Sequence, residues 1–548
     1  MIPLPMSGYA NTPNPTNEIQ RQQEREEVIR KQQIPEPDVR LQIPQAVAES
    51  LPEETNCFMI DIIRLTGDEA DQFQWALSAA DQPGDEALGR CLGGQGVNLI
   101  MKRIQNAIIK KGYVTTRVLA KPQDLNNGEL ELFIVPGRIK SIRFDNFSQR
   151  GTNLWTAFPA SPGDLLNLRD IEQALENLRR LPTAEADIQI VPGAQPGESD
   201  LVVLWKQRQP LRFSLSADDS GSEATGRYQG SATLSVDNPF LLNDLFYASF
   251  SNDLGGGDSR DYGTEGYSLY YMIPVGYWTL SFSFGKSEYH QTVAGATTDY
   301  IYRGDSETGS AKLSRLLYRD ATQKLTLGVE GWTKRSSNYI DDTEVLVQRR
   351  RTAGWAADIQ HQAFIGQNVL NVSAAYRRGT GAFDTMPAPE EAFNEGTSRF
   401  TLITLNAGLQ VPFTYSGHQF SYSLGYRGQW NKTPLVPQDR FSIGNRYTVR
   451  GFDGEATLSS ERGWLIRNDL GWHLPNTRQE LYLGLDYGRV SGPSVENLLG
   501  HQLAGTVLGL RGSLFGIAYD TFAGMPLDKP DGFETPGMTL GFNLNWSL

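Results

Sequence analysis

Residues 209–548 of this chain alternate apolar and polar side chains with a period of two, and this pattern restricts the possible folds more than any other feature. The final segment is the clearest case, since residues 538, 540, 542, 544, 546 and 548 are apolar and those between them are polar or glycine. Successive side chains of a strand point to opposite faces. The alternation therefore predicts many strands, each with one apolar and one polar face.

Two classes of protein have such strands. In a soluble sandwich or barrel the apolar faces meet in a core, whereas in an outer-membrane barrel they face lipid. Residues 209–548 exceed the length of ordinary soluble β domains, and the Gly-, Asp- and Ser-rich residues 252–264 and 304–309 are expected to be extracellular loops. If each strand with its share of the connections takes roughly 20 residues, residues 209–548 hold about 16 or 17 strands. Since bacterial barrels take even numbers, we predict a transmembrane β-barrel of 16 antiparallel strands.

The composition agrees with a barrel and excludes other classes. The 548 residues include 55 Gly, 22 Tyr, 24 Phe and 10 Trp, which suits tight turns and aromatic girdles. No apolar run reaches the roughly 18 to 20 residues of a membrane-spanning helix. The formal net charge of −13 argues against nucleic acid as a partner.

The sequence contains no recognisable catalytic or metal-binding motif. Its five histidines are isolated, and H-E-x-x-H, G-x-S-x-G, P-loop and dinucleotide-binding motifs are absent. We therefore expect no enzymatic activity, no metal site and no cofactor. Cys57 and Cys91 are either a disulfide in an oxidising compartment or two free buried thiols, and the sequence leaves both open.

The amino-terminal region divides into three parts. Residues 1–16 are proline-rich and predicted to be irregular, residues 17–33 are predicted to be a helix, and residues 34–54 are predicted to be an extended linker. The first five residues show no secretory signal peptide. Either the protein is not exported or its numbering begins at a processed amino terminus, and the barrel pattern favours the second.

The predicted helix is unusually polar. Asn17 is its candidate N-cap, with Gln20 three residues later, and only Ile19, Val28 and Ile29 are apolar. Such a helix has no face for a dry core. It is either a solvated tail or a helix in a wet cavity such as a barrel lumen, and the residues alone favour the tail.

Between the linker and the barrel, the pattern is mixed. Residues 55–135 combine strand patterns with a helical pattern at 97–111, and residues 136–208 repeat this order around an amphipathic helix at 168–181. We predict two small α+β modules.

Two short motifs stand out within the barrel. Val449-Arg450-Gly451-Phe452 lies in a glycine-rich stretch predicted to be a loop. In the second motif, the side that alternates with the apolar face of the strand holds Gly484, Asp486 and Gly488. Since the apolar face meets lipid, these three positions lie on the lumen side. A guanidinium binds a carboxylate with two hydrogen bonds, so Arg450 is a candidate partner of Asp486. The alternative is two separately solvated charges.

These motifs resemble those of the Omp85 and two-partner-secretion superfamily. Residues 449–452 look like the VRGF signature of its sixth extracellular loop, and residues 484–488 are similar to its inner-wall motif F/G-x-D-x-G. The two modules look like POTRA domains and follow a polar helix. The chain is therefore identified as a TpsB transporter rather than a barrel-assembly insertase, because insertases generally have more POTRA domains and lack that helix.

The resemblance implies an outer-membrane barrel at 209–548 behind two periplasmic POTRA domains at 55–135 and 136–208. Such a transporter exports one large TpsA exoprotein, unfolded and without ATP. The partner would be an adhesin, a haemolysin or a contact-dependent growth-inhibition toxin, and the transporter a monomer in outer-membrane lipid. POTRA domains would receive the partner by strand addition.

The resemblance also implies roles for particular residues. The polar helix would plug the resting pore, which reverses the reading from its composition, and Arg450 would pair with Asp486 to hold the loop in the lumen. The plug residues named on this basis are Asn17, Ile19, Arg21, Arg25, Val28 and Ile29.

Three other functions are weaker alternatives. A barrel-assembly factor is disfavoured by having only two modules and a plug helix. An adhesin or receptor barrel would make the motif pair accidental. An outer-membrane enzyme has the least support, because catalytic motifs are absent.

Overall fold

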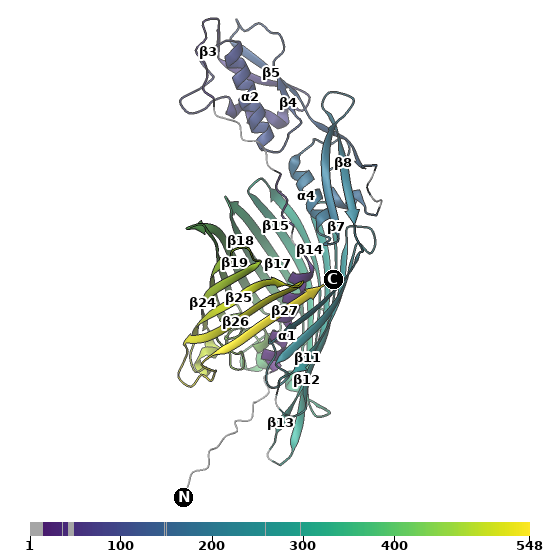
Figure 1. Cartoon of the computed structure of the whole chain (residues 1–548), viewed down its shortest axis with the longest axis vertical. Helices are drawn as coiled ribbons and strands as arrows, with labels where there is room; N and C mark the ends of the chain where they lie inside the picture. The colour runs from purple at the N-terminus through teal and green to yellow at the C-terminus, as the bar shows by residue number, and fades with distance from the viewer. Residues whose placement is uncertain are drawn as a thin grey trace.

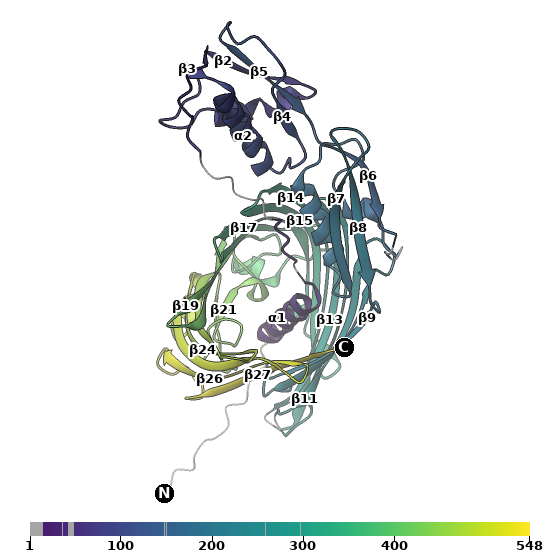
Figure 2. The same cartoon turned by 45° about the horizontal axis from the view of Figure 1, so that its top comes forward.

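A computed structural model describes residues 15–35, 37–41, 49–146, 148, 151–257, 259–295 and 297–548. Two small α+β domains stand beyond one end of a closed barrel, and a single helix lies inside it (Figure 1 and Figure 2). None of the described helices is long and apolar enough to cross a membrane. The predicted irregular segment 1–16 falls outside the described residues up to residue 14, and residues 15 and 16 are helical.

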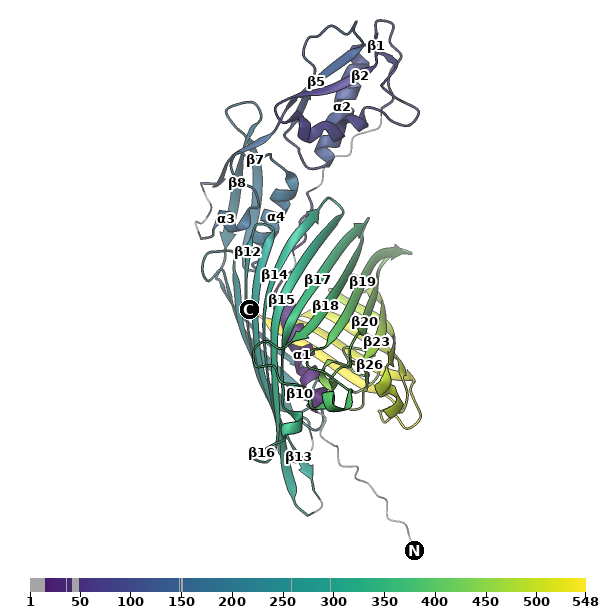
Figure 3. The same cartoon turned by 180° about the vertical axis from the view of Figure 1, so that it is seen from behind.

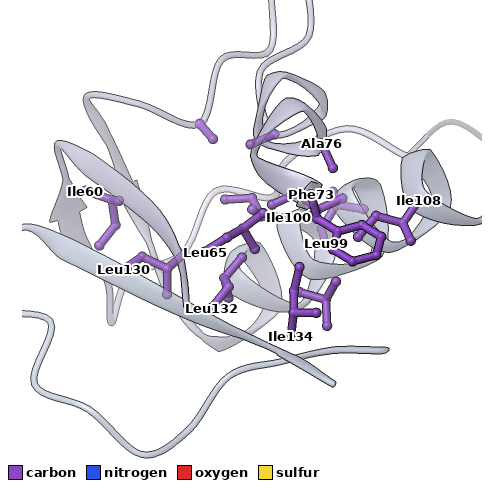
Figure 4. Packing of buried hydrophobic residues seen from close by; sticks show 14 of the residues in the cluster. Ile60, Leu65, Phe73, Ala76, Leu99, Ile100, Ile108, Leu130, Leu132 and Ile134 are labelled. Atoms are coloured by element: carbon purple, nitrogen blue, oxygen red, sulfur yellow. The ribbon is translucent and has the colours of Figure 1, made fainter. Parts of the chain in front are cut away.

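The first domain packs a helix against a small sheet. Its core contains Phe73, Ile100, Leu130 and Leu132 (Figure 4). The three-stranded sheet has the order β2-β5-β4, and β1 pairs with β3 separately. The elements are β1 (Phe58–Ile60), β2 (Ile62–Gly67), the 3-10 helix η1 (Ala70–Ala79), β3 (Arg90–Leu92), α2 (Gly94–Lys110), β4 (Arg117–Leu119) and β5 (Glu129–Val135).

A disulfide joins Cys57 to Cys91. Cys91 lies on β3 opposite Met59 of β1, so the bridge closes the end of this two-stranded sheet. Of the two states that the sequence left open, the structure contains the bridged one.

The second domain has the same type of core. Its helix α4 begins after Asn167, whose side chain accepts a hydrogen bond from Arg169 N, as an N-cap does. Apolar residues of α4 pack against the sheet β6-β8-β7. The elements are β6 (Arg138–Phe144), α3 (Leu154–Ala157), α4 (Leu168–Arg179), β7 (Ala184–Pro192) and β8 (Glu198–Gln207).

The barrel is closed by antiparallel pairing of its last strand, β27, with its first, β9. The two-residue β16 only extends the edge of β15, so 16 strands form the wall, as predicted. The wall strands are β9 (Leu211–Asp218), β10 (Tyr228–Asp237), β11 (Leu245–Gly255), β12 (Tyr262–Val275), β13 (Trp278–Ala294), β14 (Asp299–Arg319), β15 (Gln323–Ile340), β17 (Arg350–Ile365), β18 (Asn368–Thr380), β19 (Thr401–Tyr415), β20 (His418–Asn431), β23 (Arg462–His473), β24 (Gln479–Ser491), β25 (Gln502–Leu514), β26 (Ile517–Asp528) and β27 (Thr539–Ser547). The connections hold β16 (Thr343–Glu344), η2 (Leu346–Gln348), η3 (Pro389–Phe393), η4 (Pro437–Asp439), β21 (Phe441–Ile443), β22 (Leu458–Ser460) and η5 (Pro493–Asn497).

The predicted loops were wrong in part. Residues 304–309 lie inside β14, a strand of 21 residues, and only residues 256–261 connect β11 to β12. A strand needs about 9 to 11 residues to cross the membrane, so β14 extends well beyond it. There the outward face no longer meets lipid, although Tyr302 and Ser306 on the other face are buried, and Gly, Asp and Ser no longer signal the end of a strand.

A buried ionic cluster joins the second domain to the barrel. Arg319, at the end of β14, lies 3.0 Å from Glu172 and 2.9 Å from Glu176, both of α4. It also donates to the carbonyl oxygen of Val39, which belongs to the segment after the lumen helix. One arginine thus connects the barrel, the second domain and that segment.

Candidate functional site

The loop that carries the first motif folds into the barrel. It connects β20 to β23 and contains the small sheet β21-β22. Val449 and Phe452 are buried in an apolar cluster with Ile443 of β21 and with Leu503 of the barrel wall. The loop therefore carries its own small core, packed against the inner wall.

Arg450 and Asp486 form the ion pair considered from the sequence. Arg450 Nε lies 2.7 Å from Asp486 Oδ2, and Nη2 lies 2.7 Å from Oδ1. The backbone N–H of Arg450 also donates to Oδ2 at 2.9 Å. Their side chains are only 4% and 1% exposed, so the pair is shielded from the solvent that would weaken it.

A second carboxylate, Asp469, was missed by the sequence analysis. It accepts a hydrogen bond from Arg450 Nη2 at 2.5 Å. Asp469 stands opposite Gly484 in the register of β23 and β24. A signal was present, since Asp469 has inward parity, but only the register shows that it faces the motif arginine.

Glycines on three successive strands give the loop room to approach. A Cβ at Gly484 of β24 would lie 2.6 Å from Arg450 Nη2, and one at Gly505 of β25 would lie 1.8 Å from Arg450 O. At Gly524 of β26 it would lie 2.9 Å from the Cα of Gly451, whose own φ is +99°. These three glycines form a trough for the loop backbone, and the sequence analysis identified only Gly484. Gly488, the other motif glycine, faces Val449, because a Cβ there would lie 2.8 Å from Val449 Cγ2.

The same loop contacts the closing seam of the barrel. Arg446 donates to the carbonyl oxygen of Phe542 at 3.1 Å and pairs with Asp219, which follows β9. Asp219 in turn accepts from Phe542 N at 2.9 Å. The side chains of Arg446 and Asp219 thus form hydrogen bonds with the backbone of β27, just beyond the last residue that pairs with β9.

Helix α1 (Pro15–Gln33) occupies the lumen (Figure 2). Arg25 donates to Gln229 at 2.8 Å and to Ser220 at 3.2 Å, and Gln33 donates to Ser214 at 2.8 Å. Most of its wall contacts are polar. Ile29 adds an apolar contact, because it lies in a small cluster with residues of β11 and β12.

Helix α1 also touches the loop. Arg21 Nη2 donates to the carbonyl oxygen of Gly454 at 2.5 Å, and Asn17 accepts from Thr457 at 3.2 Å. The predicted start of the helix was wrong, because it includes Pro15 and therefore places Asn17 inside the first turn instead of at the N-cap. Proline favours the first turn of a helix, where its missing N–H has no partner to lose.

The structure brings together most of the residues singled out from the sequence. Both barrel motifs meet on the inner wall, and Asn17 and Arg21 reach the loop that holds one of them. Ile19 is buried, and Val28 is half-buried, in the same lumen. The bridged cysteines lie apart, in the first domain.

The site is suited to holding a segment in place. Its ion pairs and close backbone contacts anchor the loop, and polar contacts seat the helix. Among the described residues, no group of three or more His, Cys, Asp or Glu side chains could hold a metal ion.

Comparisons with known proteins agree with this architecture. Residues 197–512 match the family described as haemolysin secretion/activation protein ShlB/FhaC/HecB. Residues 58–137 match the ShlB-type POTRA domain, and residues 138–192 match a further POTRA family.

Individual relatives extend over nearly the whole chain. Outer membrane transporter CdiB-2 of Burkholderia pseudomallei is 39% identical over 96% of this chain and 92% of its own length. The CdiB of Dickeya dadantii is 27% identical over 100% of this chain and 97% of its own length. The solved structure of CdiB from Acinetobacter baumannii has a TM-score of 0.85 and 31% identity, covering 98% of this chain and all of that one.

The family model covers more than half of the chain, and the first of these relatives exceeds 30% identity across almost all of it. The TpsB resemblance noted in the sequence is confirmed, and with it the outer-membrane location of the barrel and the periplasmic location of its POTRA domains. The chain belongs to the ShlB/FhaC/HecB family of haemolysin secretion/activation proteins and is an outer-membrane transporter.

Proposed function

We propose that this transporter exports a large TpsA exoprotein in unfolded form through its barrel, without ATP, after α1 leaves the lumen. The observation that carries this proposal is the way α1 is seated. Its side chains bond the wall and loop mainly through polar groups, for which water can substitute. A plug held in this way can leave without exposing a large apolar surface.

The proposed partner is an exoprotein such as a haemolysin, an adhesin or a contact-dependent growth-inhibition toxin. Haemolysin secretion appears in the description of the matched family. We propose that the POTRA domains bind this partner at a sheet edge, where unpaired backbone groups can accept an added strand.

The proposed working units follow the boundaries expected from the sequence. They are a plug at 17–33, a linker at 34–54, POTRA domains at 55–135 and 136–208, and a barrel at 209–548. We further propose that one copy of the chain forms a complete pore, because the barrel closes within a single chain.

The proposed sites are the loop anchor and the plug. Arg450 and Asp486 would hold the loop against the wall in both resting and exporting states. Arg21 and Arg25 would hold the plug only in the resting state, since their contacts are lost when α1 leaves.

Planar-bilayer conductance tests the plug. A variant lacking residues 15–33 should give large, steady currents, whereas the parent should give small or intermittent ones. Arg30→Gln is the matched control, because Arg30 lies on the same helix but is exposed and should leave the currents unchanged. Equal conductance of parent and deletion variant would contradict the plugged-pore mechanism.

Export is tested separately in outer-membrane vesicles that are supplied with the partner. Depleting ATP in outer-membrane vesicles should leave transfer of an unfolded partner intact, and a partner locked by an engineered disulfide should stall. Transfer of the locked partner at the parental rate would refute export in unfolded form.

A further inference from the structure

The outer wall carries a row of cationic side chains near the rim that lies away from the POTRA domains. On β15 the lipid-facing positions include Leu327 and Val329, which are 41% and 53% exposed. Arg335 is separated from Leu327 and Val329 by even numbers of residues along the strand. It is exposed and lies toward the end of the strand. Since side chains alternate along a strand, Arg335 points outward.

Arg335 is paired with another arginine. In the register of β15 and β17 it stands directly opposite Arg351, which is also exposed. Like charges directly opposite each other destabilise a sheet. Glu307 stands opposite Arg335 on the other side, yet no ion pair within 4.0 Å joins either arginine to a carboxylate among the described residues.

The row continues around the wall, where three further cations lie beside an outward aromatic ring and Arg462 bonds the side chain of Asn431 at 2.7 Å. Arg378 stands opposite Trp355, and Arg489 stands opposite Trp464. Lys432 lies 5.9 Å from the centre of the Tyr376 ring. We call Arg335, Arg351, Arg378, Lys432, Arg462 and Arg489 the basic belt, and within the described part of the chain none of them forms an ion pair.

The position of the basic belt identifies the leaflet that it faces. Its members lie at or near strand ends on the side away from the POTRA domains, which are periplasmic (Figure 3). Outward aromatic residues mark the boundary between hydrocarbon and headgroups in membrane barrels. The basic belt therefore lies at the headgroup level of the outer leaflet.

We propose that the basic belt binds the phosphorylated headgroups of outer-leaflet lipids, with Arg335 and Arg351 clamping one phosphate between them. An arginine binds a phosphate with two parallel hydrogen bonds. An anion between two facing arginines replaces their repulsion with attraction. Because these side chains point away from the lumen, an exported polypeptide inside the barrel does not reach them, and this inference does not depend on the proposed export function.

Lipid titration of the purified full chain in neutral detergent tests the belt. The probe is bisphosphorylated lipid A, with bound molecules counted by native mass spectrometry. The double variant Arg335→Gln/Arg351→Gln should bind it about tenfold more weakly, as expected from loss of charge-assisted hydrogen bonds. Lipid A stripped of its phosphates should bind to the parent about as weakly.

The control is Arg478→Gln, an exposed arginine near the opposite rim, which should bind like the parent. The double variant should also melt no lower than the parent without lipid, because it removes a repulsion. Parental lipid binding by the double variant, or an equal loss in Arg478→Gln, would overturn the proposal. Displacement of lipid A by inorganic phosphate at the same concentration would also overturn it, since a free anion would then be the ligand.

Discussion

Arg450 uses both its backbone and its side chain on one carboxylate. The N–H group, Nε and Nη2 all reach Asp486, and Nη2 also reaches Asp469. A lysine could supply the charge but not this planar arrangement of donors. The loop is therefore held by geometry as much as by charge.

We expect Asp486→Asn to detach the loop. Arg450 keeps Asp469 as an ionic partner, but the carboxylate that accepts three of its hydrogen bonds is lost, and a hydrogen bond to a charged group contributes about 1.5–3 kcal/mol. Protease cleavage of the loop should rise sharply, and the amount of exported partner should fall at least severalfold. Leu483→Ala is the control, since Leu483 lies on the same strand but faces outward and is 49% exposed; equal effects of both changes would remove the case for the pair.

Gly505→Ala tests the glycine trough. The added Cβ would clash with Arg450 O at 1.8 Å, so the loop must move away from the wall. We expect the same protease sensitivity as in Asp486→Asn. Gly331→Ala should have no effect, because a Cβ there meets nothing within 4 Å, and a loop that stays protected in Gly505→Ala would contradict the trough.

The sequence identified part of this site. Parity placed Asp486 on the inner wall and suggested Arg450 as its partner. Asp469, Gly505 and Gly524 were missed because their contacts depend on the stagger between neighbouring strands. Alternation within one strand reveals the face of a residue but contains no information about its height relative to the next strand.

Helix α1 is an element whose stability comes from its surroundings. It has few apolar residues, and its seat combines polar contacts from β9, β10 and the loop. Its composition alone pointed to a solvated tail, because the partners of Arg25 and Gln33 lie some 200 residues later in the chain. Only the resemblance to TpsB transporters predicted a helix in the lumen.

We expect Arg25→Gln to loosen the plug without removing it. Arg25 bonds Gln229 and Ser220, and loss of hydrogen bonds from a charged donor costs about 1.5–3 kcal/mol. Single-channel recordings should show more frequent openings than the parent does. Openings no more frequent than those of Arg30→Gln would argue that Arg25 does not hold the plug.

Helix α2 in the first POTRA domain depends on a carboxylate outside it. Glu54 accepts hydrogen bonds from the backbone N–H groups of Gln95, Gly96 and Gly93. These bonds, led by that from Gln95, lower the pKa of Glu54 below its ordinary value of 4.5. A carboxylate at a helix start is favourable, because the unpaired N–H groups there carry partial positive charge.

The stabilisation by Glu54 should depend on pH. A lowered folded-state pKa means that the contribution is complete above the ordinary value and is lost as the pH falls through the folded value. Glu54→Gln should therefore lower the melting temperature of this domain at pH 7 and have progressively less effect below about pH 4. Calorimetry of the full chain measures this, and a constant difference across that range would refute the charge-based explanation.

At the scale of the whole molecule, one buried cation is part of the contact between the second POTRA domain and the barrel, together with bonds such as those of Asn177 to Gly276 and of Tyr277 to Asp170. Arg319 joins α4 to the end of β14 and to the backbone of Val39. The segment after the plug therefore shares its anchor with the POTRA domain. A shift of either at this point therefore changes the surroundings of the guanidinium that both of them contact.

We expect Arg319→Gln to loosen the second POTRA domain on the barrel without detaching it, because other bonds between the two remain. The variant removes the hydrogen bonds that Arg319 donates to Glu172 and Glu176, while Arg169 and Lys324 remain as their partners, so we expect a cost of about 1.5–3 kcal/mol. The distribution of distances between spin labels on α4 and on the barrel should become measurably wider than in the parent. Arg315→Gln, on the same strand but without an ion pair among the described residues, is the control, and a narrow distribution in Arg319→Gln would show that other contacts suffice.

The location of α1 also sets an order of events in time. Its residues are synthesised before every strand of the wall that holds it, and its contacts with Ser214, Gln229 and Gly454 join positions that emerge long after it. The seat for the helix is complete only once β9, β10 and the loop have all formed. With α1 in its proposed role as a plug, a barrel that closes before the helix has entered is an open pore in the outer membrane, and the time until the helix is seated determines how long the membrane leaks.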